Sequence, residues 1–521
     1  MKFVKSLVPA ALLLPAFAQP AATSIVMTDR AAARFLDQAT WGPTSASIVE
    51  LQQVGITNWL NSQFALNTSD LPDQPILGSD GKPNRDLSPV QAAFFQNAVT
   101  GQDQLRQRVA FALSEIWVVS AVSTNNAYAF PPYWRLFRDN AFGNYRDLMK
   151  AVTLSPAMGN YLNMANNNKG NSVTDTAANE NYARELMQLF TVGLMQLHPD
   201  GTPVLDANGN PVPTYDQSVV TNTARALTGW TYPTAPGATA RKNNPAYFLG
   251  SMFAVETDHD TTAKTIIGGV TVPAGQTAEQ DLDSVLDALI AQPALAPFVS
   301  RQLIQHLVTS NPSPSYVERI TNVFVNNGAG VRGDLKAVIT AILTDPEARA
   351  GDDPSAIPNA GFGHLREPVL FLANLLRGLN ATIDATNTIK NQSNLLGQNL
   401  FYPPSVFSYF SPQYRLESRQ PAPEFQIYST QTAAARANVV TTALYGKLDK
   451  TTTLDLTPFQ QHGNDLATLI DFVGYAFLHH SMSSALQQAA SNAAEAAATP
   501  LGRVQAALYV VLTSSEYQVI Q

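Results

Sequence analysis

The sequence predicts a mainly α-helical protein: a large multi-helix domain with one or two short β-hairpins. Two observations support this class. Apolar residues recur at helical spacing in many segments, and these segments begin at Thr, Ser or Asn residues that can cap helices. Only residues 203–213 and 264–273 have the pattern of paired strands, because Asn208-Gly209 and Gly268-Gly269 supply turns between extended stretches.

The chain opens with the pattern of a secretion signal. Lys2 and Lys5 form a basic start, residues 6–17 form a short apolar run, and Ala16-Phe17-Ala18 fits a cleavage site of small residues. We therefore expect residues 1–18 to be a signal peptide and residues 19–521 to form a single domain. The protein would then be exported, to the periplasm or the extracellular space, and the signal looks bacterial.

The first predicted helices follow local start and stop signals. Thr28 and Thr44 can cap two of them, Gly42-Pro43 separates these two, and Ser88-Pro89 places proline in the first turn of another. The expected helices of this part cover 28–37, 44–54, 56–64 and 103–120, with others that start at 88, 133, 145 and 155.

Residues 103–120 form the helix that we expect at the centre of the fold, because it is apolar almost all round. After its first turn the charged residues are few: Arg106, Arg108 and Glu115. Arg108 and Glu115 lie two turns apart on the same side of this helix.

A further helix begins near Asn179, whose side chain can cap it. Tyr182, Leu186 and Phe190 recur on one face, and Glu185 falls on the flank of that apolar face. Glu185 should therefore be at least half buried. A buried carboxylate needs a partner or a shifted pKa.

The second half of the chain is also predicted to be helical. Residues 233–260 form a long irregular segment, and two lobes could meet near residues 235–275. Residues 400–413 are aromatic and contain Pro403-Pro404, which indicates a packed loop. The expected helices are 215–227, 279–290, 294–309, 313–327, 332–344, 364–376, 423–444, 466–478, 483–498 and 501–514.

Composition excludes several kinds of protein. The chain has no cysteine, which excludes disulfides, thiolate metal sites and a cysteine nucleophile. The net charge is −8 and no dense basic patch is present, so we expect no nucleic-acid partner. After the N-terminal run, no apolar stretch reaches spanning length without polar interruption, so we expect no membrane span. No metal-ligand spacing is present either, and we expect no metal and no cofactor.

Several motifs follow one another along the chain. They are Arg106-Gln-Arg-Val-Ala-Phe-Ala-Leu-Ser-Glu-Ile-Trp117, Asn179-Glu-Asn-Tyr-Ala-Arg-Glu-Leu-Met-Gln-Leu-Phe190, Ala226-Leu-Thr-Gly-Trp230, His259-Asp260 with Lys264, Leu365-Arg-Glu-Pro368, Pro403-Pro404-Ser-Val-Phe407 and Pro423-Glu-Phe425. Through them, residues 27–520 resemble a bacterial family called domain of unknown function eighteen-hundred (DUF1800). Gln292 departs from the family pattern, which has His there. The resemblance implies an exported protein, often accompanied by a co-secreted protein of a sulfatase-like family, and it implies no catalytic residues.

Glu185 is the strongest candidate for chemistry. One interpretation makes it a general acid whose pKa is raised by an apolar flank. The other makes it the partner of Arg106 or Arg108, which would only fix the packing of two helices. Arg184 lies with Glu180 on the opposite face, where an ion pair four residues apart accounts for both.

Two further groups of residues are candidates for a site. His259 and Asp260 end the long irregular segment, where the imidazole could serve as a general base or lie in an exposed acidic turn. Asn163, Asn167 and Asn179 belong to an amide-rich stretch before a helix, which could bind hydroxyl groups or form an ordinary solvated loop.

Two functions remain open. The protein could be an enzyme that acts on extracellular polysaccharide, with Glu185, His259 and Asp260 as catalytic residues. Asn163, Asn167, Asn179, Arg184, Arg106 and Arg108 would then bind the substrate. Alternatively, it is a non-catalytic envelope or secretion partner of a co-exported protein. An enzyme requires these residues to converge on an open cleft, whereas a scaffold does not.

Overall fold

The structure is a computed structural model, and it describes residues 27–171, 173–353, 361–417, 419–479 and 482–521. The predicted signal peptide lies outside the described residues. Helices dominate the remainder, which confirms the mainly α class. The helices of the first half are α1 (Asp29–Ala39), α2 (Ser45–Ala65), α3 (Ser88–Thr100), α4 (Gln104–Ile116), α5 (Phe130–Asn140), α6 (Tyr145–Thr153), α7 (Pro156–Tyr161), α8 (Asn181–Glu185) and α9 (Gln217–Ala226).

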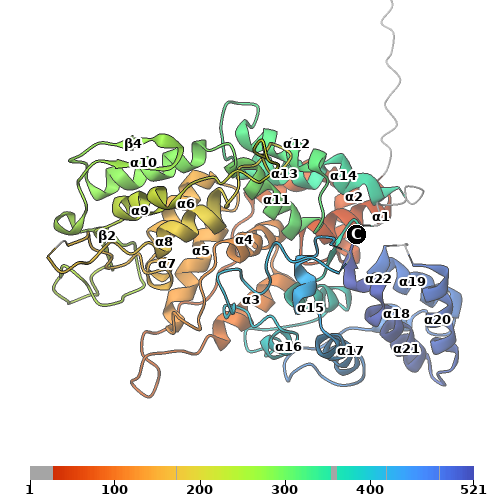
Figure 1. Ribbon diagram of the computed structural model, residues 1–521. Coiled ribbons are helices and arrows are strands. Elements are labelled where there is room, and N and C mark those ends of the chain that lie inside the picture. Colours follow the sequence, from red (N-terminus) through yellow and green to blue (C-terminus); the bar gives the residue numbers. More distant parts are fainter. Residues whose placement is uncertain (1–26, 172, 354–360, 418, 480–481) are drawn as a thin grey trace, which may run out of the picture.

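The second half continues with helices of similar length and three very short ones. They are α10 (Ala278–Ala291), α11 (Leu295–Leu307), α12 (Pro314–Val325), α13 (Leu335–Thr344), α14 (Pro346–Arg349), α15 (Pro368–Gly378), α16 (Lys390–Leu395), α17 (Thr430–Tyr445), α18 (Thr457–Gln460), α19 (Leu466–Leu478), α20 (Ser484–Glu495), α21 (Pro500–Thr513) and α22 (Ser515–Gln518). In Figure 1, α7 to α10 lie at one end of the molecule, α18 to α22 at the other, and α4 between them.

The central position of α4 follows from its sequence. This helix packs against α2, α5 and α11, and all its residues except Arg106 and Ser114 are buried. Burial of a helix on nearly every side requires apolar residues on nearly every side, as predicted. Its two buried charged residues, Arg108 and Glu115, are therefore held inside the molecule.

Strands are few and short. Three two-stranded antiparallel sheets are present among the described residues. β3 (Lys264–Thr265) and β4 (Thr271–Val272) form the predicted hairpin at 264–273, and an antiparallel bridge joins Leu205 to Pro211 around the predicted turn at 208–209. Another bridge joins Leu197 to Pro203, before that turn. The pairs β1 (Trp230–Thr231) with β2 (Phe253–Ala254), and β5 (His364–Leu365) with β6 (Val519–Ile520), were not predicted.

The helix predicted from Asn179 differs from a regular α-helix. The Asn179 side chain accepts a hydrogen bond from the Asn181 backbone amide, and α8 starts there. The chain then widens into a π-helix over Leu186–Thr191. The Thr191 hydroxyl donates to the Leu186 carbonyl, which satisfies an acceptor in the widened turn. Leu189, within this π-helix, is half buried and lines a groove beside α11.

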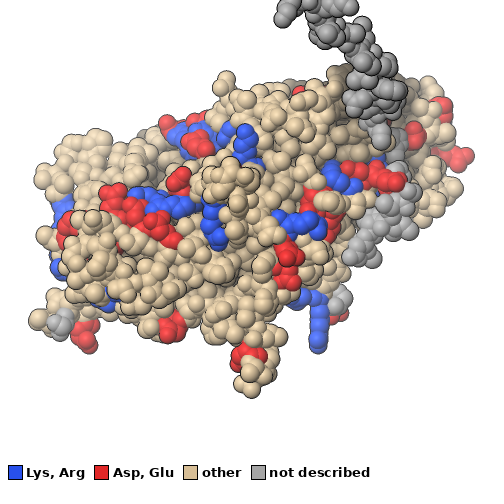
Figure 2. Space-filling view, turned by 90° about the horizontal axis from the view of Figure 1, so that it is seen from above, with Lys and Arg blue, Asp and Glu red and all other residues tan. Residues whose placement is uncertain are grey.

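Charged residues make up only 14 % of the chain. On the face shown in Figure 2, Lys, Arg, Asp and Glu form small mixed patches separated by broad uncharged areas. Among the described residues, no single helix has the length and hydropathy needed to cross a membrane. The pair α10 and α11 meets these criteria only jointly, across a 75° bend.

Candidate functional site

A groove of about 580 Å³ opens beside α11. Its walls come from the π-helix and the segment that follows it, from α11, and from the loop at 407–421. Apolar side chains form much of the lining, and several amides and two arginines complete it. The lining residues include Leu194, Met195, Phe298, Arg301, Gln302, Gln305, Phe407, Gln413 and Arg415.

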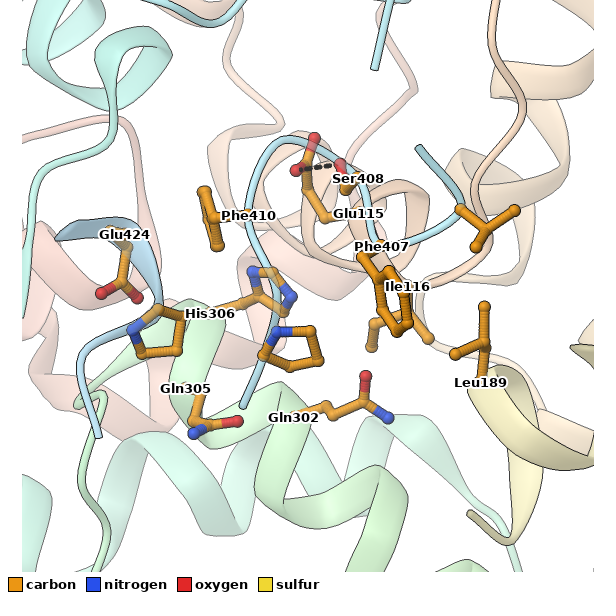
Figure 3. A pocket seen from close by; sticks show the side chains of 13 residues that line it. Glu115, Ile116, Leu189, Gln302, Gln305, His306, Phe407, Ser408, Phe410 and Glu424 are labelled. Carbon is orange, nitrogen blue, oxygen red and sulfur yellow. Dashed lines mark hydrogen bonds between the residues drawn. The ribbon is translucent and has the colours of Figure 1, made fainter. Parts of the chain in front are cut away.

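At its inner end the groove adjoins a smaller pocket of about 30 Å³. The groove and the pocket share Leu189, Gln302, Gln305, Phe407 and Pro412. In Figure 3, Glu115 and Glu424 approach this inner pocket from different sides, and His306 lies between them in this view. The two carboxyl groups and the imidazole come from α4, the 3₁₀ helix at Pro423–Ile427 and α11.

Glu115 is only 8 % exposed, and its Oε2 accepts a hydrogen bond from the Ser408 hydroxyl at 2.7 Å. Burial, together with the nearby charge of Glu367, raises the pKa of Glu115 well above its usual range. Burial therefore favours the protonated form of the Glu115 carboxyl group. A protonated carboxyl group can donate a proton or a hydrogen bond to a ligand.

Glu424 is the second carboxyl group of the inner pocket. Its Oε2 accepts a hydrogen bond from the Ser310 hydroxyl at 2.8 Å, and its Oε1 lies 3.9 Å from His364 Nδ1. Burial raises the pKa of Glu424 to about 8. Glu424 thus changes its charge close to neutral pH, in the range where an acid–base catalyst works best.

His306 adds an imidazole that stays uncharged. Burial and the positive charge of Arg108 lower the pKa of His306 to about 3. The Arg108 side chain also donates to the His306 backbone carbonyl, which links α4 to α11. An uncharged imidazole carries one donor and one acceptor nitrogen, so it can orient a ligand hydroxyl or a water molecule.

Behind the pocket lies a network of buried charges. Arg108 is fully buried, and the charges of Glu367, Glu115 and Asp37 partly offset the effect of burial, which lowers the pKa of Arg108 to about 10. Arg366 and His479 bind Asp37, with His479 Nε2 at 3.0 Å from Oδ2. Burial opposes ionisation of Asp37, but these partners lower its pKa to about 2. The inner pocket therefore borders a region of fixed charge.

The structure places Glu185 apart from the groove. Its side chain is half-buried, and burial raises its pKa, as the sequence suggested. However, neither Arg106 nor Arg108 is its partner: Arg106 donates to the carbonyls of Arg138 and Phe64, and Glu185 Oε2 has no hydrogen-bond partner within the described chain. The ion pair that one interpretation predicted is therefore not formed, because both arginines donate to backbone carbonyls of other elements.

The structure also places His259 and Asp260 apart from the groove. His259 is fully buried, with Nε2 at 3.1 Å from Asp281 Oδ2 and Nδ1 at 3.0 Å from the Thr228 carbonyl. Asp260 binds Arg225 at 2.8 Å. Neither residue lines the groove. Both instead hold the irregular segment against α9 and α10.

The predicted substrate-binding residues are dispersed. The Asn167 side-chain amide donates a hydrogen bond to the Asn179 carbonyl and accepts one from the Asn179 backbone amide. The Asn163 side chain accepts a hydrogen bond from the Asn181 side-chain amide. Arg184 forms the expected pair with Glu180 at 2.9 Å. These contacts stabilise turns and the start of a helix. They do not place the predicted substrate-binding residues next to Glu115 or Glu424.

The motifs in the sequence include the acidic residues at and behind the inner pocket, but the residue types alone did not show that they meet there. Glu115, Glu367 and Glu424 each lie inside one of the motifs quoted above, and they come from distant parts of the chain. His306 follows the apolar run of α11 and lines the pocket. Local periodicity does not show which distant carboxylates meet. In the described part of the chain, no group of three acidic or histidine side chains could hold a metal ion.

Comparison with known proteins identifies one family. A family model described as "Protein of unknown function (DUF1800)" matches residues 34–519. Neither a curated protein nor a solved structure matches the chain.

Proposed function

The chain belongs to the DUF1800 family of proteins of unknown function, and we propose that it is an exported enzyme that cleaves extracellular polysaccharide in the groove. One observation carries this proposal: an open groove adjoins a small pocket that is lined by two carboxyl groups with raised pKa values and by an uncharged imidazole. The proposal therefore rests on Glu115, Glu424 and His306 rather than on Glu185, His259 and Asp260.

The three groups have separate roles in this proposal. The protonated carboxyl of Glu115 gives its proton to the glycosidic oxygen as the bond from that oxygen to the sugar carbon breaks. Glu424, in its ionised form, takes a proton from the water whose oxygen bonds to the same carbon. His306 orients that water or a sugar hydroxyl. Because Glu424 must be ionised, kcat/KM should rise as the pH approaches about 8.

The groove supports a sugar ligand in two ways. Amide groups of Gln302, Gln305 and Gln413 can exchange hydrogen bonds with hydroxyl groups. Phe298 and Phe407 offer apolar surface to the C–H faces of sugar rings. Groove and inner pocket share lining residues, so a chain bound in the groove would place one linkage near Glu115.

Release of reducing ends from a panel of neutral and uronic polysaccharides tests the proposal. We expect Glu115→Gln and Glu424→Gln to lose activity by about 100-fold or more, because each removes an acid–base group. Glu50→Gln, at an exposed position on α2, is the matched control and should keep full activity. Full activity in both pocket variants would reject the proposed roles, and no activity of the intact protein on any substrate would reject the enzyme itself.

A second function is favoured by a separate observation. Leu194 and Phe407 at the groove are 48 % and 40 % exposed, and such apolar positions also suit a segment of a co-exported protein. The protein would then be a non-catalytic partner, for which the sulfatase-like co-secreted family is the candidate. Leu194→Asp should abolish co-purification with such a partner, whereas Glu115→Gln should not affect it.

A further inference from the structure

Two arginines line the groove without an acidic partner. Arg301 lies on α11, and Arg415 lies on the loop that forms the facing wall. Arg415 donates to the Arg419 carbonyl at 2.8 Å. Within the described chain, no carboxylate forms an ion pair with either guanidinium. Other arginines of this protein differ: Arg146 pairs with Asp283 and Asp287.

The two guanidinium groups are close enough to affect each other. Burial, followed by the positive charge of Arg415, lowers the pKa of Arg301. Two like charges at one groove repel each other, and desolvation of Arg301 adds to the cost. A bound anion between them would offset both effects. Guanidinium groups bind carboxylate, sulfate and phosphate oxygens in pairs of parallel hydrogen bonds.

The arginines also have a defined position relative to the inner pocket. Arg301 and Gln305 lie four residues apart on one face of α11, and Gln302 and His306 are related in the same way. The rise along the helix from Arg301 to His306 is about 7.5 Å. The groove that Arg301 lines shares Gln302 and Gln305 with the inner pocket, so an anionic group held by Arg301 would lie in the groove next to the pocket that Glu115 and His306 line.

From this arrangement we infer that the groove selects an anionic polysaccharide, and that Arg301 and Arg415 jointly bind one carboxylate or sulfate group of the sugar chain. The apolar lining and the Gln amides suit the sugar backbone, and the two arginines supply the charge. This inference specifies the substrate class of the proposed enzyme, and its statement about cleavage rests on that proposed function. Binding itself can be measured independently.

Calorimetric titration of the mature protein tests the inference. The ligands are oligosaccharides of equal length that are neutral, uronate-containing or sulfated. We expect binding of at least one anionic ligand, weaker binding of the neutral one, and lower affinity at high salt. Arg301→Gln and Arg415→Gln should each weaken anionic binding by about 10-fold or more, because each variant loses charge-assisted hydrogen bonds to the anionic group.

Three controls separate the outcomes. Arg85→Gln, at an exposed position outside the groove, should bind as the unaltered protein does. Arg301→Lys keeps the charge but loses the paired geometry, and its thermal unfolding shows whether the fold is retained. Glu115→Gln should bind anionic oligosaccharide normally without cleaving it.

Equal affinity of the neutral and anionic ligands, or unchanged anionic binding in both arginine variants, would overturn the inference. Anionic binding without cleavage by the intact protein would support the inference and reject the proposed enzyme. Cleavage of neutral polysaccharide that is unchanged in both arginine variants would support the proposed enzyme and overturn the inference. Comparison of the uronate and sulfated ligands identifies which anionic group the site takes.

Discussion

At the scale of single residues, the chemistry of this protein depends on where a carboxyl group is buried. Glu115 and Glu424 are nearly inaccessible and have raised pKa values, whereas Glu180 is exposed to solvent on one side and paired with Arg184. Sequence patterning identified one half-buried carboxyl group, Glu185, from its place on a local helix. It did not identify Glu424, because the residues that bury Glu424 are distant in sequence.

Glu424 should make the stability of the protein depend on pH. Its pKa rises from a usual value of 4.5 to about 8 on folding, so the folded state binds a proton that the unfolded state releases. The free energy of unfolding should therefore fall between about pH 5 and pH 8, by about 1.4 kcal/mol per pKa unit at most. Urea unfolding at both ends of this range measures the fall.

Glu424→Gln provides the comparison for this prediction. The uncharged amide has no proton to lose, so the variant should lose less stability over the same pH range. Glu50→Gln should retain the original dependence, since Glu50 is exposed. If Glu424→Gln and the unaltered protein show the same slope, Glu424 does not carry the shifted proton.

Glu185 should tolerate replacement better than an ion-paired residue would. It makes no ion pair with Arg106 or Arg108, and burial disfavours its charge. Glu185→Gln should consequently change the free energy of unfolding by less than about 1 kcal/mol at neutral pH. Chemical unfolding measures this difference, and a loss of about 3–5 kcal/mol would indicate that Glu185 has a buried cationic partner after all.

At the scale of secondary-structure elements, local sequence signals predicted the positions of many helices, but they did not predict which distant segments pair. Caps and periodicity located α10, α11 and α19 closely, because helix formation depends on residues within a few turns. The β5–β6 pair joins residues more than 150 positions apart in the chain, and no local pattern indicates such a contact. The π-helix after α8 likewise required knowledge of its packing.

The buried polar contacts between α10 and the irregular segment that precedes it allow a prediction about these elements. Asp281 of α10 is fully buried and binds both Lys264 and His259, with Lys264 Nζ at 2.6 Å. Asp281→Asn would leave the buried Lys264 ammonium without its counter-charge. We expect a loss of about 3–5 kcal/mol in the free energy of unfolding, measured by chemical denaturation.

Asp283 is the matched control for Asp281. It lies on the same helix and also binds two cationic side chains, Arg146 and Lys150, but these pairs are at the surface. Asp283→Asn should cost about 1 kcal/mol or less, because solvent screens the pairs. Equal losses for Asp281→Asn and Asp283→Asn would show that burial does not determine the strength of these ties.

At the scale of the whole molecule, one central helix joins the core to the candidate site. α4 packs against helices from both halves of the chain, and it carries Arg108 toward Glu367 and Glu115 toward the inner pocket. The sequence predicted a central helix from its apolar surface. The groove was not predicted, because its walls come from residues near 190, 300 and 410 that only the complete fold brings together.

Arg108 should therefore influence the stability of the molecule as a whole. Arg108→Met would remove a fully buried positive charge that interacts with Glu367, Glu115 and Asp37. We expect a loss of about 3–5 kcal/mol, because carboxylates would remain buried without this charge. Since α4 contacts both halves, the loss should lower a single unfolding transition followed by circular dichroism rather than split it.

The double variant Arg108→Met with Glu367→Gln distinguishes lost charge pairing from lost packing. Removal of the Glu367 charge takes away a carboxylate that Arg108 balances, so the double variant should regain part of the stability lost in Arg108→Met. Additive losses would mean that Arg108 acts through packing and its bond to the His306 carbonyl. A recovery would show that the charges of Arg108 and Glu367 are coupled behind the pocket.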